Sequence, residues 1–312
     1  MAKSGYRILE SLFHEDGDLY LQKYHERYDS ESSFHFSICI GKWPAFLVPT
    51  RQLLVLQESV LHNIARFDKI LLNSSIREVW LHEALFREIE LNCAIENIHA
   101  SRPALEAAFS NPQDPARPFS GMTCQYAALL SSSSFRFTEH LQKIRLIYDG
   151  MLLAGICQED PDNIPDGSLF RAQAVYYFKG NQKIHCGIWP EKQIERDLQE
   201  ALTIVHDERM TVLFRAAVFH FLFGYIHPFY DGNGRLCRYL TALFLAEQLG
   251  MLCAFELSAA LYGRRHKYAQ AFKTCEQQLN RGDLTPFVLF FLEALNTCLE
   301  HEISRLEQQP GR

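Results

Sequence analysis

The twelve residues His227-Pro-Phe-Tyr-Asp-Gly-Asn-Gly-Arg-Leu-Cys-Arg238 separate two strongly apolar segments of the chain. Before them, Val212–Ile226 is so apolar that it predicts a buried helix. After them, Leu236–Leu249 predicts a second helix. Gly232 and Gly234 allow the backbone between the helices to take positive φ. The stretch therefore predicts a glycine-rich loop that opens a buried helix.

A loop of this kind points several backbone N–H groups and the positive end of a helix dipole at one place, which favours an anion such as phosphate. Arg235 and Arg238 lie one helical turn apart, so both can face that anion. Asp231 offers a carboxylate oxygen to Mg²⁺, the usual companion of substrate phosphates. His227 suits a general base, because histidine as a residue type titrates near neutrality. Each feature alone is commonplace, but together they predict a phosphate-binding active site.

The rest of the chain reads as all-α with a single β-hairpin. Helical spacing is predicted near Ile8–Phe13 within an otherwise irregular arm (residues 1–46), and over Pro49–Leu72, Ile76–Ile98 and Leu141–Ile156. Ser75 and Glu78 have the spacing of a capping box, and Ser131–Ser134 interrupts a helical region. Ala174–Phe178 and Lys183–Trp189, joined by Lys179–Gln182, predict the hairpin, and the tail Gln308–Arg312 is expected to fray.

Composition narrows the classes of function. The chain has 312 residues, 47% apolar and 22% charged, which indicates a globular protein. Its net charge of −6 and pI of about 6.1 argue against a nucleic-acid-binding chain. Nine scattered cysteines without a C-x-x-C pair favour a reducing compartment. No signal peptide or membrane span is apparent, so we expect a soluble, cytoplasmic protein with no membrane partner.

The stretch 227–238 resembles the complete Fic motif, H-P-F-x-[D/E]-G-N-G-R-x-x-R, at every specified position. The resemblance extends over residues 140–297 and implies a helical Fic fold with a β-hairpin flap. Arg265–Tyr268 is similar to a later family motif, with Arg264 and Ala269 departing from it. The expected domains are an N-terminal helical region (1–110), a proline-rich linker and helical connector (111–139), the Fic domain (140–297) and a C-terminal helix end and tail (298–312).

The resemblance also implies an activity: transfer of AMP from Mg·ATP to a Ser, Thr or Tyr hydroxyl of a target protein. His227 would deprotonate the hydroxyl, and Asp231 would hold Mg²⁺. The nucleotide would be bound by residues drawn from both motifs: Asp231, Gly232, Asn233, Gly234, Arg235, Arg238 and Tyr268. The target would dock by strand addition along the flap near Lys183–Cys186. The oligomeric state stays open, a homodimer included.

A second match lies before this region. Asn92-Cys-Ala-Ile-Glu96-Asn97 resembles the family's inhibitory motif, [S/T]-x-x-x-E-[G/N], with Asn92 in place of the usual Ser or Thr. On a helical wheel Glu96 falls within about 20° of Leu85 and Ile89, on an apolar stripe. A carboxylate there needs a cationic partner, which the family would supply as Arg238, unless the side chain reaches solvent at the helix end. The match implies the class that is inhibited from its own N-terminal side, through Glu96 and Asn97.

The transferred group stays open at this stage, since UMP, GMP or phosphocholine could take the place of AMP, and two other functions remain open as well. The same site could remove AMP from a modified protein, with Glu96 orienting a water. The chain could also be a non-catalytic nucleotide-sensing or toxin-type regulatory module, although an intact His227 speaks against that.

Overall fold

The computed structural model describes residues 6–72, 77–112, 114, 117–131, 136–179 and 182–308. The chain divides into two compact units, one of residues 1–67 and 263–312, the other of residues 68–262. The predicted capping box at Ser75, most of the serine run 131–134, the hairpin turn at 180–181 and the tail beyond 308 lie outside the described residues. The predicted domain boundaries stay predictions.

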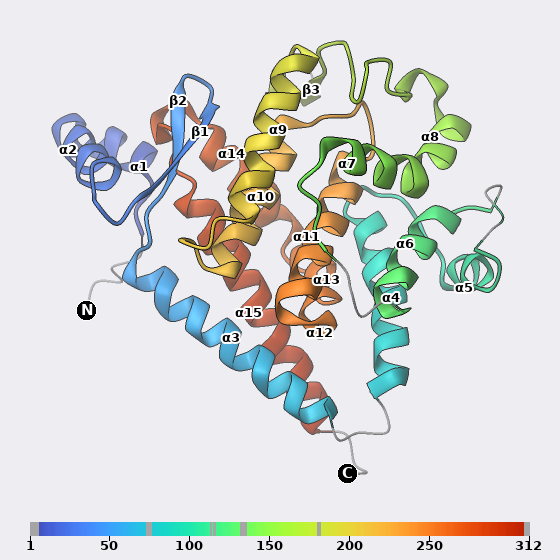
Figure 1. The fold of residues 1–312 in the computed structure, drawn as a ribbon. Coiled ribbons are helices and arrows are strands. Elements are labelled where there is room, and N and C mark those ends of the chain that lie inside the picture. The colour runs from blue at the N-terminus through green and yellow to red at the C-terminus, as the bar shows by residue number, and fades with distance from the viewer. Residues whose placement is uncertain are drawn as a thin grey trace. The chain divides into compact units, whose positions relative to one another are not determined.

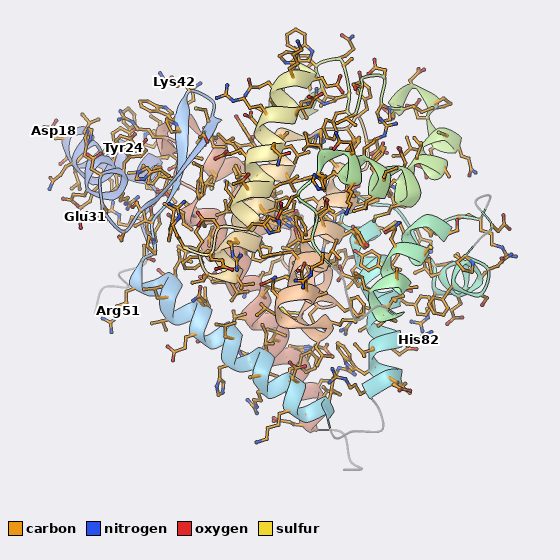
Figure 2. All side chains as sticks on the ribbon, viewed as in Figure 1. Asp18, Tyr24, Glu31, Lys42, Arg51 and His82 are labelled. Carbon is orange, nitrogen blue, oxygen red and sulfur yellow. The ribbon has the colours of Figure 1, made fainter. Side chains whose placement is uncertain are left out.

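The first unit combines helices with a two-stranded sheet (Figure 1). Its elements are α1 (Leu9–Glu15), α2 (Gly17–Tyr28), β1 (Phe34–Ile40), β2 (Trp43–Leu47), most of α3 (Arg51–Leu72), α14 (Arg265–Glu276) and α15 (Thr285–Glu307). The strands pair antiparallel, from Phe34 opposite Leu47 to Ile40 opposite Trp43. In Figure 2, Tyr24 lies on α2 and Lys42 lies at the tip of this hairpin.

This hairpin corrects the sequence interpretation, which expected an irregular arm over residues 1–46 and a single hairpin in the chain. The short helix near Ile8–Phe13 is confirmed as α1, but α2, β1 and β2 were missed. Along β1 the buried side chains alternate with exposed ones, at Phe36, Ile38 and Ile40. Mixed polar residues and aromatics hid this short alternation in a stretch that reads as polar overall.

The second unit is built around a buried helix, α10 (Val212–Ile226), with α9 (Glu191–Val205) and α11 (Asn233–Leu249) packed against it (Figure 1). Almost every residue of α10 is buried, as its apolar run predicts. Around these helices lie α4 (Arg77–Ala94), α5 (Arg102–Ser110), α6 (Ser120–Ser131), α7 (Leu141–Tyr148), α8 (Ala154–Glu159), α12 (Met251–Ala254) and α13 (Leu257–Tyr262). The fold class, helical with a hairpin flap, is confirmed.

Two local features differ from the sequence prediction. The helix expected over Leu141–Ile156 contains a π-helical turn, η1 (Asp149–Leu153), between α7 and α8. The helix expected to reach Ile98 ends at Ala94.

The predicted hairpin is present as β3 (Tyr176–Lys179) and β4 (Gln182–Cys186), paired antiparallel. None of the described helices has both the length and the apolar character needed to cross a bilayer.

Candidate active site

His227 lies at the end of α10, and its backbone has φ 56° and ψ 63°. This is the left-handed region, which residues other than Gly and Asn rarely adopt. Its backbone N–H donates to the Phe223 carbonyl at 3.1 Å, and Nδ1 lies 3.1 Å from the Gly224 carbonyl. A carbonyl only accepts, so Nδ1 carries the hydrogen in the neutral ring and Nε2 carries the lone pair. The tautomer is therefore the one that presents Nε2 as a base.

Arg171 holds the backbone around His227. Its guanidinium is buried and donates to three carbonyls: Nε to His227 at 2.9 Å, Nη1 to Gln173 at 2.6 Å and Nη2 to Ile188 at 2.6 Å. The hairpin base is thus joined to the loop that carries His227. Gly187 is required in this packing, since a Cβ there would lie 2.4 Å from Arg171 Nη2. Sequence reasoning missed Arg171, because nothing local distinguishes an arginine that binds backbone carbonyls of distant segments.

The glycine-rich loop is closed by Asn233. Its side chain accepts a hydrogen bond from the Phe229 N–H at 2.9 Å and donates to the Phe229 carbonyl at 2.8 Å. This side chain therefore shapes the loop. The group of Asn233 that can bind a phosphate at the start of α11 is its backbone N–H. Gly232 has φ 78°, and a Cβ there would lie 2.8 Å from Leu152 Cδ1. A side chain at position 232 would be strained by the positive φ, and the end of the Leu152 side chain would have to move to make room for it.

Arg235 and Arg238 are buried and face one anion, as predicted, and in this structure the anion is the carboxylate of Glu96. Oε1 accepts from Arg238 Nη2 at 2.7 Å, and Oε2 lies 3.2 Å from Arg235 Nε. A Cβ at Gly234 would lie only 2.0 Å from Glu96 Oε1, so the carboxylate lies against the first turn of α11. Glu96 therefore lies at the anion site that the loop was predicted to form.

The end of α4 explains how Glu96 is presented. The Ile98 N–H donates to the Cys93 carbonyl and the Asn97 N–H to the Ala94 carbonyl, each at 3.1 Å, which is the pattern of a Schellman turn. Asn97 takes the left-handed position with φ 61°. Glu96 is thus the C-cap residue and 26% exposed, rather than a residue on a continuous helical stripe. A carboxylate at a helix C-terminus is disfavoured by the helix dipole, and the two arginines offset that cost.

Asn92, which replaces the usual Ser or Thr of the inhibitory motif, is fully buried and binds Arg238. Its Oδ1 accepts from Arg238 Nε at 2.7 Å, and its carbonyl accepts from Arg238 Nη2 at 2.9 Å. Its Nδ2 donates to the Tyr126 hydroxyl at 2.8 Å and to the Arg235 carbonyl at 3.2 Å. The amide therefore ties α4 to both arginine positions and to Tyr126 at once, whereas a hydroxyl, with a single donor, could not donate to both Tyr126 and Arg235.

Glu88, one turn before Asn92, extends this buried network. Its carboxylate accepts from the Ser258 N–H at 2.8 Å and from the Ser258 hydroxyl at 2.6 Å. Burial raises the pKa of Glu88 to about 7, against the hydrogen bonds from Ser258, which lower it. Arg87, its neighbour, forms an ion pair with the buried Glu256. Both contacts fasten α4 to the segment around α13, so the turn that carries Glu96 rests on a fixed helix.

Asp231 is the carboxylate of the loop. Its Oδ1 accepts from the Gly232 N–H at 2.6 Å, and its Oδ2 lies 3.0 Å from Arg235 Nη2. The side chain is 41% exposed, so its oxygens can reach a ligand. Among the described residues no group of three or more His, Cys, Asp or Glu could hold a metal ion. One exposed hard oxygen donor fits Mg²⁺ that is bound chiefly through substrate phosphates.

The remaining predicted site residues are Tyr268 and the flap edge, Lys183–Cys186. Tyr268 belongs to the other compact unit, where its ring packs with Phe272, Phe287 and Phe290. Its assignment to the nucleotide stays a prediction. Lys183–Cys186 lie on β4 as predicted, but the side chains of residues 183–185 lie outside the described part of the chain.

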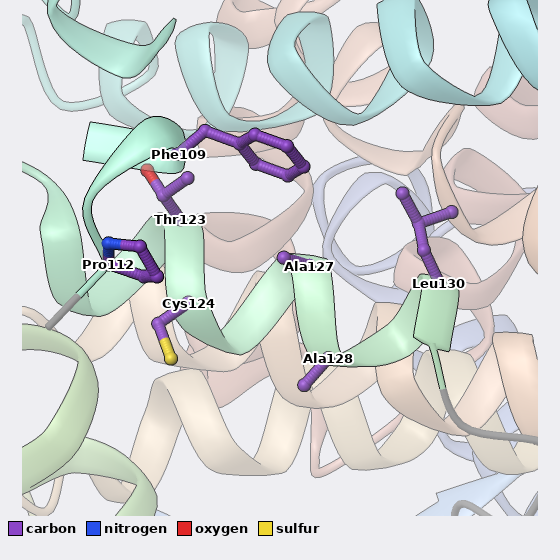
Figure 3. Close-up of a pocket in the computed structure, with 7 residues that line it drawn as sticks. All are labelled: Phe109, Pro112, Thr123, Cys124, Ala127, Ala128 and Leu130. Carbon is purple, nitrogen blue, oxygen red and sulfur yellow. The ribbon is translucent and has the colours of Figure 1, made fainter. Parts of the chain in front are cut away.

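A separate hollow of about 460 Å³ lies between α5 and α6 (Figure 3). Phe109 and Pro112 line one side, and Thr123, Cys124, Ala127, Ala128 and Leu130 line the α6 side. None of the predicted site residues lines it.

Comparison with known proteins finds Fic proteins over part of the chain. Residues 139–245 match the Fic/DOC family, about a third of the chain. The match ends before Arg265–Tyr268, which the sequence resemblance had included. Over 75 residues the chain is 37% identical to the protein adenylyltransferase Fic of Nematostella vectensis, covering 24% of this chain and 16% of that protein. The corresponding Aedes aegypti protein is 34% identical over 85 residues, covering 27% and 15%. The match thus spans about a sixth of these curated relatives.

Solved structures extend the likeness in fold beyond the matched segment. A Fic family protein from Desulfovibrio desulfuricans G20 has a TM-score of 0.65 at 21% identity, covering 83% of this chain and 76% of that one. Fic-1 from C. elegans has a TM-score of 0.53 at 17% identity, covering 81% and 73%. Residues 139–245, with the complete loop motif around His227, thus match the Fic/DOC family model, and the chain has the fold of the solved Fic structures.

Proposed function

We propose that this chain is a protein adenylyltransferase that transfers AMP from Mg·ATP to a hydroxyl of a target protein. The observation that carries the proposal is the pair of buried arginines, Arg235 and Arg238, gathered around one carboxylate at the start of α11. A site that binds a carboxylate through two guanidiniums and a helix N-terminus suits a polyphosphate. His227, at the other end of the same loop, is in the tautomer that a base requires.

In the proposed reaction Nε2 of His227 takes the proton of the target hydroxyl as its oxygen attacks the α-phosphorus of ATP. The bond from the α-phosphorus to the bridging oxygen breaks, and pyrophosphate leaves. The new bond joins AMP to the target oxygen, and the proton passes to His227. Arg171 contributes by holding the carbonyl of His227, so that the imidazole keeps its position during the reaction.

The remaining loop groups bind charge. The backbone of Gly232–Gly234 would receive the α-phosphate, and Arg235 and Arg238 the outer phosphates. Asp231 would hold Mg²⁺, which neutralises charge on the phosphates when it is bound. Strand β4 would dock the target segment by strand addition at its outer edge, near Lys183–Cys186. The nine thiols suit a reducing compartment, and we place the protein in the cytoplasm.

We propose in addition that the chain is inhibited by Glu96. The carboxylate engages both arginines, so a triphosphate must displace it or bind with its outer phosphates elsewhere. Asn92 keeps Arg238 oriented in either case. The inhibited state is then the state of this structure.

The test uses labelled ATP and self-modification in the Glu96→Gly background, in which inhibition is removed. His227→Ala should lower labelling by roughly 10²–10⁴-fold, because a general base is lost, while calorimetry shows ATP binding unchanged. The matched control is His206→Ala, an exposed histidine of the same unit, which should label as its parent does. Loss of ATP binding with an unchanged residual rate would refute the assignment. Release of label by the Glu96-intact protein would instead indicate removal of AMP.

A further inference from the structure

Tyr148, the last residue of α7, lies directly behind the loop that carries His227. Its ring stacks face to face on Phe229, with centroids 3.7 Å apart and an interplanar angle of 0°. Its Cε2 would lie 3.5 Å from a Cβ at Gly232. The hydroxyl oxygen lies on the ring axis, so rotation of the ring about Cβ–Cγ does not move it. The stack therefore fixes the position of this hydroxyl relative to the loop.

The hydroxyl of Tyr148 is buried and has no hydrogen-bond partner among the described residues. A buried donor without a partner destabilises a fold, and such groups in native proteins call for an explanation. The π-helical turn η1 begins at the next residue, and π-turns of this kind are frequent at functional sites. The unpaired hydroxyl and the π-turn together indicate that this side of the loop has a functional role besides packing.

The position of the ring and the charges around the hydroxyl indicate its partner: the ring lies beside Gly232, and Asp231 is the residue before that glycine. Burial raises the pKa of Tyr148, and the largest contribution from a neighbouring charge, also raising it, comes from the carboxylate of Asp231. Arg235 and Arg145 act in the opposite direction. The hydroxyl therefore stays protonated at neutral pH and can donate to a nearby anion. The carboxylate of Asp231 is now paired with Arg235 Nη2 at 3.0 Å.

That pairing changes in the proposed function, on which this inference rests. When Arg235 turns to the phosphates of a nucleotide, Asp231 loses its cationic partner at the moment it is needed for Mg²⁺. A carboxylate that ligates a metal is usually held by a hydrogen-bond donor behind it. We propose that Tyr148 is the positioning residue for Asp231: its hydroxyl donates to the carboxylate once Arg235 leaves, and so holds the carboxylate in the orientation that binds Mg²⁺.

The test is thermal unfolding with a non-hydrolysable ATP analogue at graded Mg²⁺ concentrations, in the Glu96→Gly background. Tyr148→Phe removes only the hydroxyl. Without ligand it should unfold at the same or a higher temperature than its parent, because an unpaired buried donor is removed. With the analogue, the Mg²⁺ concentration for half-maximal stabilisation should rise by about 10–100-fold, the usual cost of losing such a partner of a metal ligand.

Tyr239→Phe is the matched control. Tyr239 is also buried, but its hydroxyl is paired with Gln125 at 3.2 Å. This variant should lose stability without ligand and keep the Mg²⁺ midpoint of its parent. An unchanged Mg²⁺ midpoint in Tyr148→Phe, with the analogue still bound, would overturn the inference and leave the proposed function standing. No stabilisation of the parent by the analogue at any Mg²⁺ concentration would overturn both.

Discussion

Removal of the Glu96 carboxylate is the perturbation that separates stability from activity most clearly. In the folded protein this carboxylate forms ion pairs with Arg238 and Arg235, whose side chains are only 2% and 7% exposed. Breaking a fully buried ion pair by removing one partner costs about 3–5 kcal/mol, because the other charge stays buried. Glu96 itself is 26% exposed, and Arg238 keeps two hydrogen bonds to Asn92. Both reduce the cost, so we expect roughly 2–3 kcal/mol for Glu96→Gly.

On a scale of about 2–4 °C per kcal/mol, that destabilisation lowers the unfolding temperature by roughly 5–10 °C. The rate of labelling should move in the opposite direction. With the arginines released, the α-phosphate can present itself in line to the attacking hydroxyl, and ~1 Å of misplacement costs on the order of 10²-fold in rate. ATP at about 100 times its Kd should restore about 2.7 kcal/mol of stability.

The assay is self-modification by labelled ATP, run beside thermal melts with and without nucleotide. Glu96→Gln tests whether charge or shape inhibits: it keeps the side-chain length but not the ion pair, so it should behave largely as Glu96→Gly does. Glu106→Gln is the surface control, because Glu106 pairs with a more exposed arginine, Arg102. If Glu96→Gly is folded and binds ATP but labels no faster than wild type, Glu96 is not the inhibitory residue.

Three further outcomes are expected. Asp231→Ala should abolish the Mg²⁺ dependence of labelling together with most of the activity; labelling that still follows Mg²⁺ as in its parent would place the metal elsewhere. Glu88→Gln should flatten the pH dependence of the free energy of unfolding, measured with urea. The pKa of Glu88 in the folded protein, about 7, lies above the ordinary value of 4.5. The contribution of protonated Glu88 to stability is therefore fully present below pH 4.5, and about 3 kcal/mol of it is lost as the pH rises through 7. If both proteins show the same slope between pH 5 and 7.5, Glu88 does not titrate there. Arg171→Lys should lower kcat by on the order of 10²-fold with ATP binding retained, because a lysine cannot bind three carbonyls in one plane. An unchanged kcat would show that Arg171 does not position His227.

Much of the site was predictable because its signals are local. The loop 227–238 carries its turn residues, its proposed anion-binding groups and its proposed base within twelve positions, so composition and spacing alone describe it. The apolar run of α10 and the β-rich segments of the flap are equally local, and both were predicted. The role of Asn97 also follows from its type, since Asn tolerates the left-handed position that ends α4.

The predictions that failed concern segments whose local sequence pattern is weak or misleading. Helix α2 begins at an ordinary cap, Asp16, whose side chain accepts from the N–H groups of Asp18 and Leu19, but few apolar residues follow. The helical wheel placed Glu96 on a continuous α4, whereas the Schellman turn ends the helix before it. The pairing with Arg238 was correct even though the helical argument for it was not.

The sequence by itself determined which chemistry can be proposed for the loop, because His227, Asp231 and the two arginines are close in the chain as well as in space. Only the tertiary structure decided which distant groups complete it: Glu96 between both arginines, Asn92 on Arg238 and Arg171 on the carbonyl of His227. These contacts join residues 56 to 146 positions apart. No periodicity or spacing encodes such a distance, because it is set by how whole helices pack and not by the backbone between the two residues.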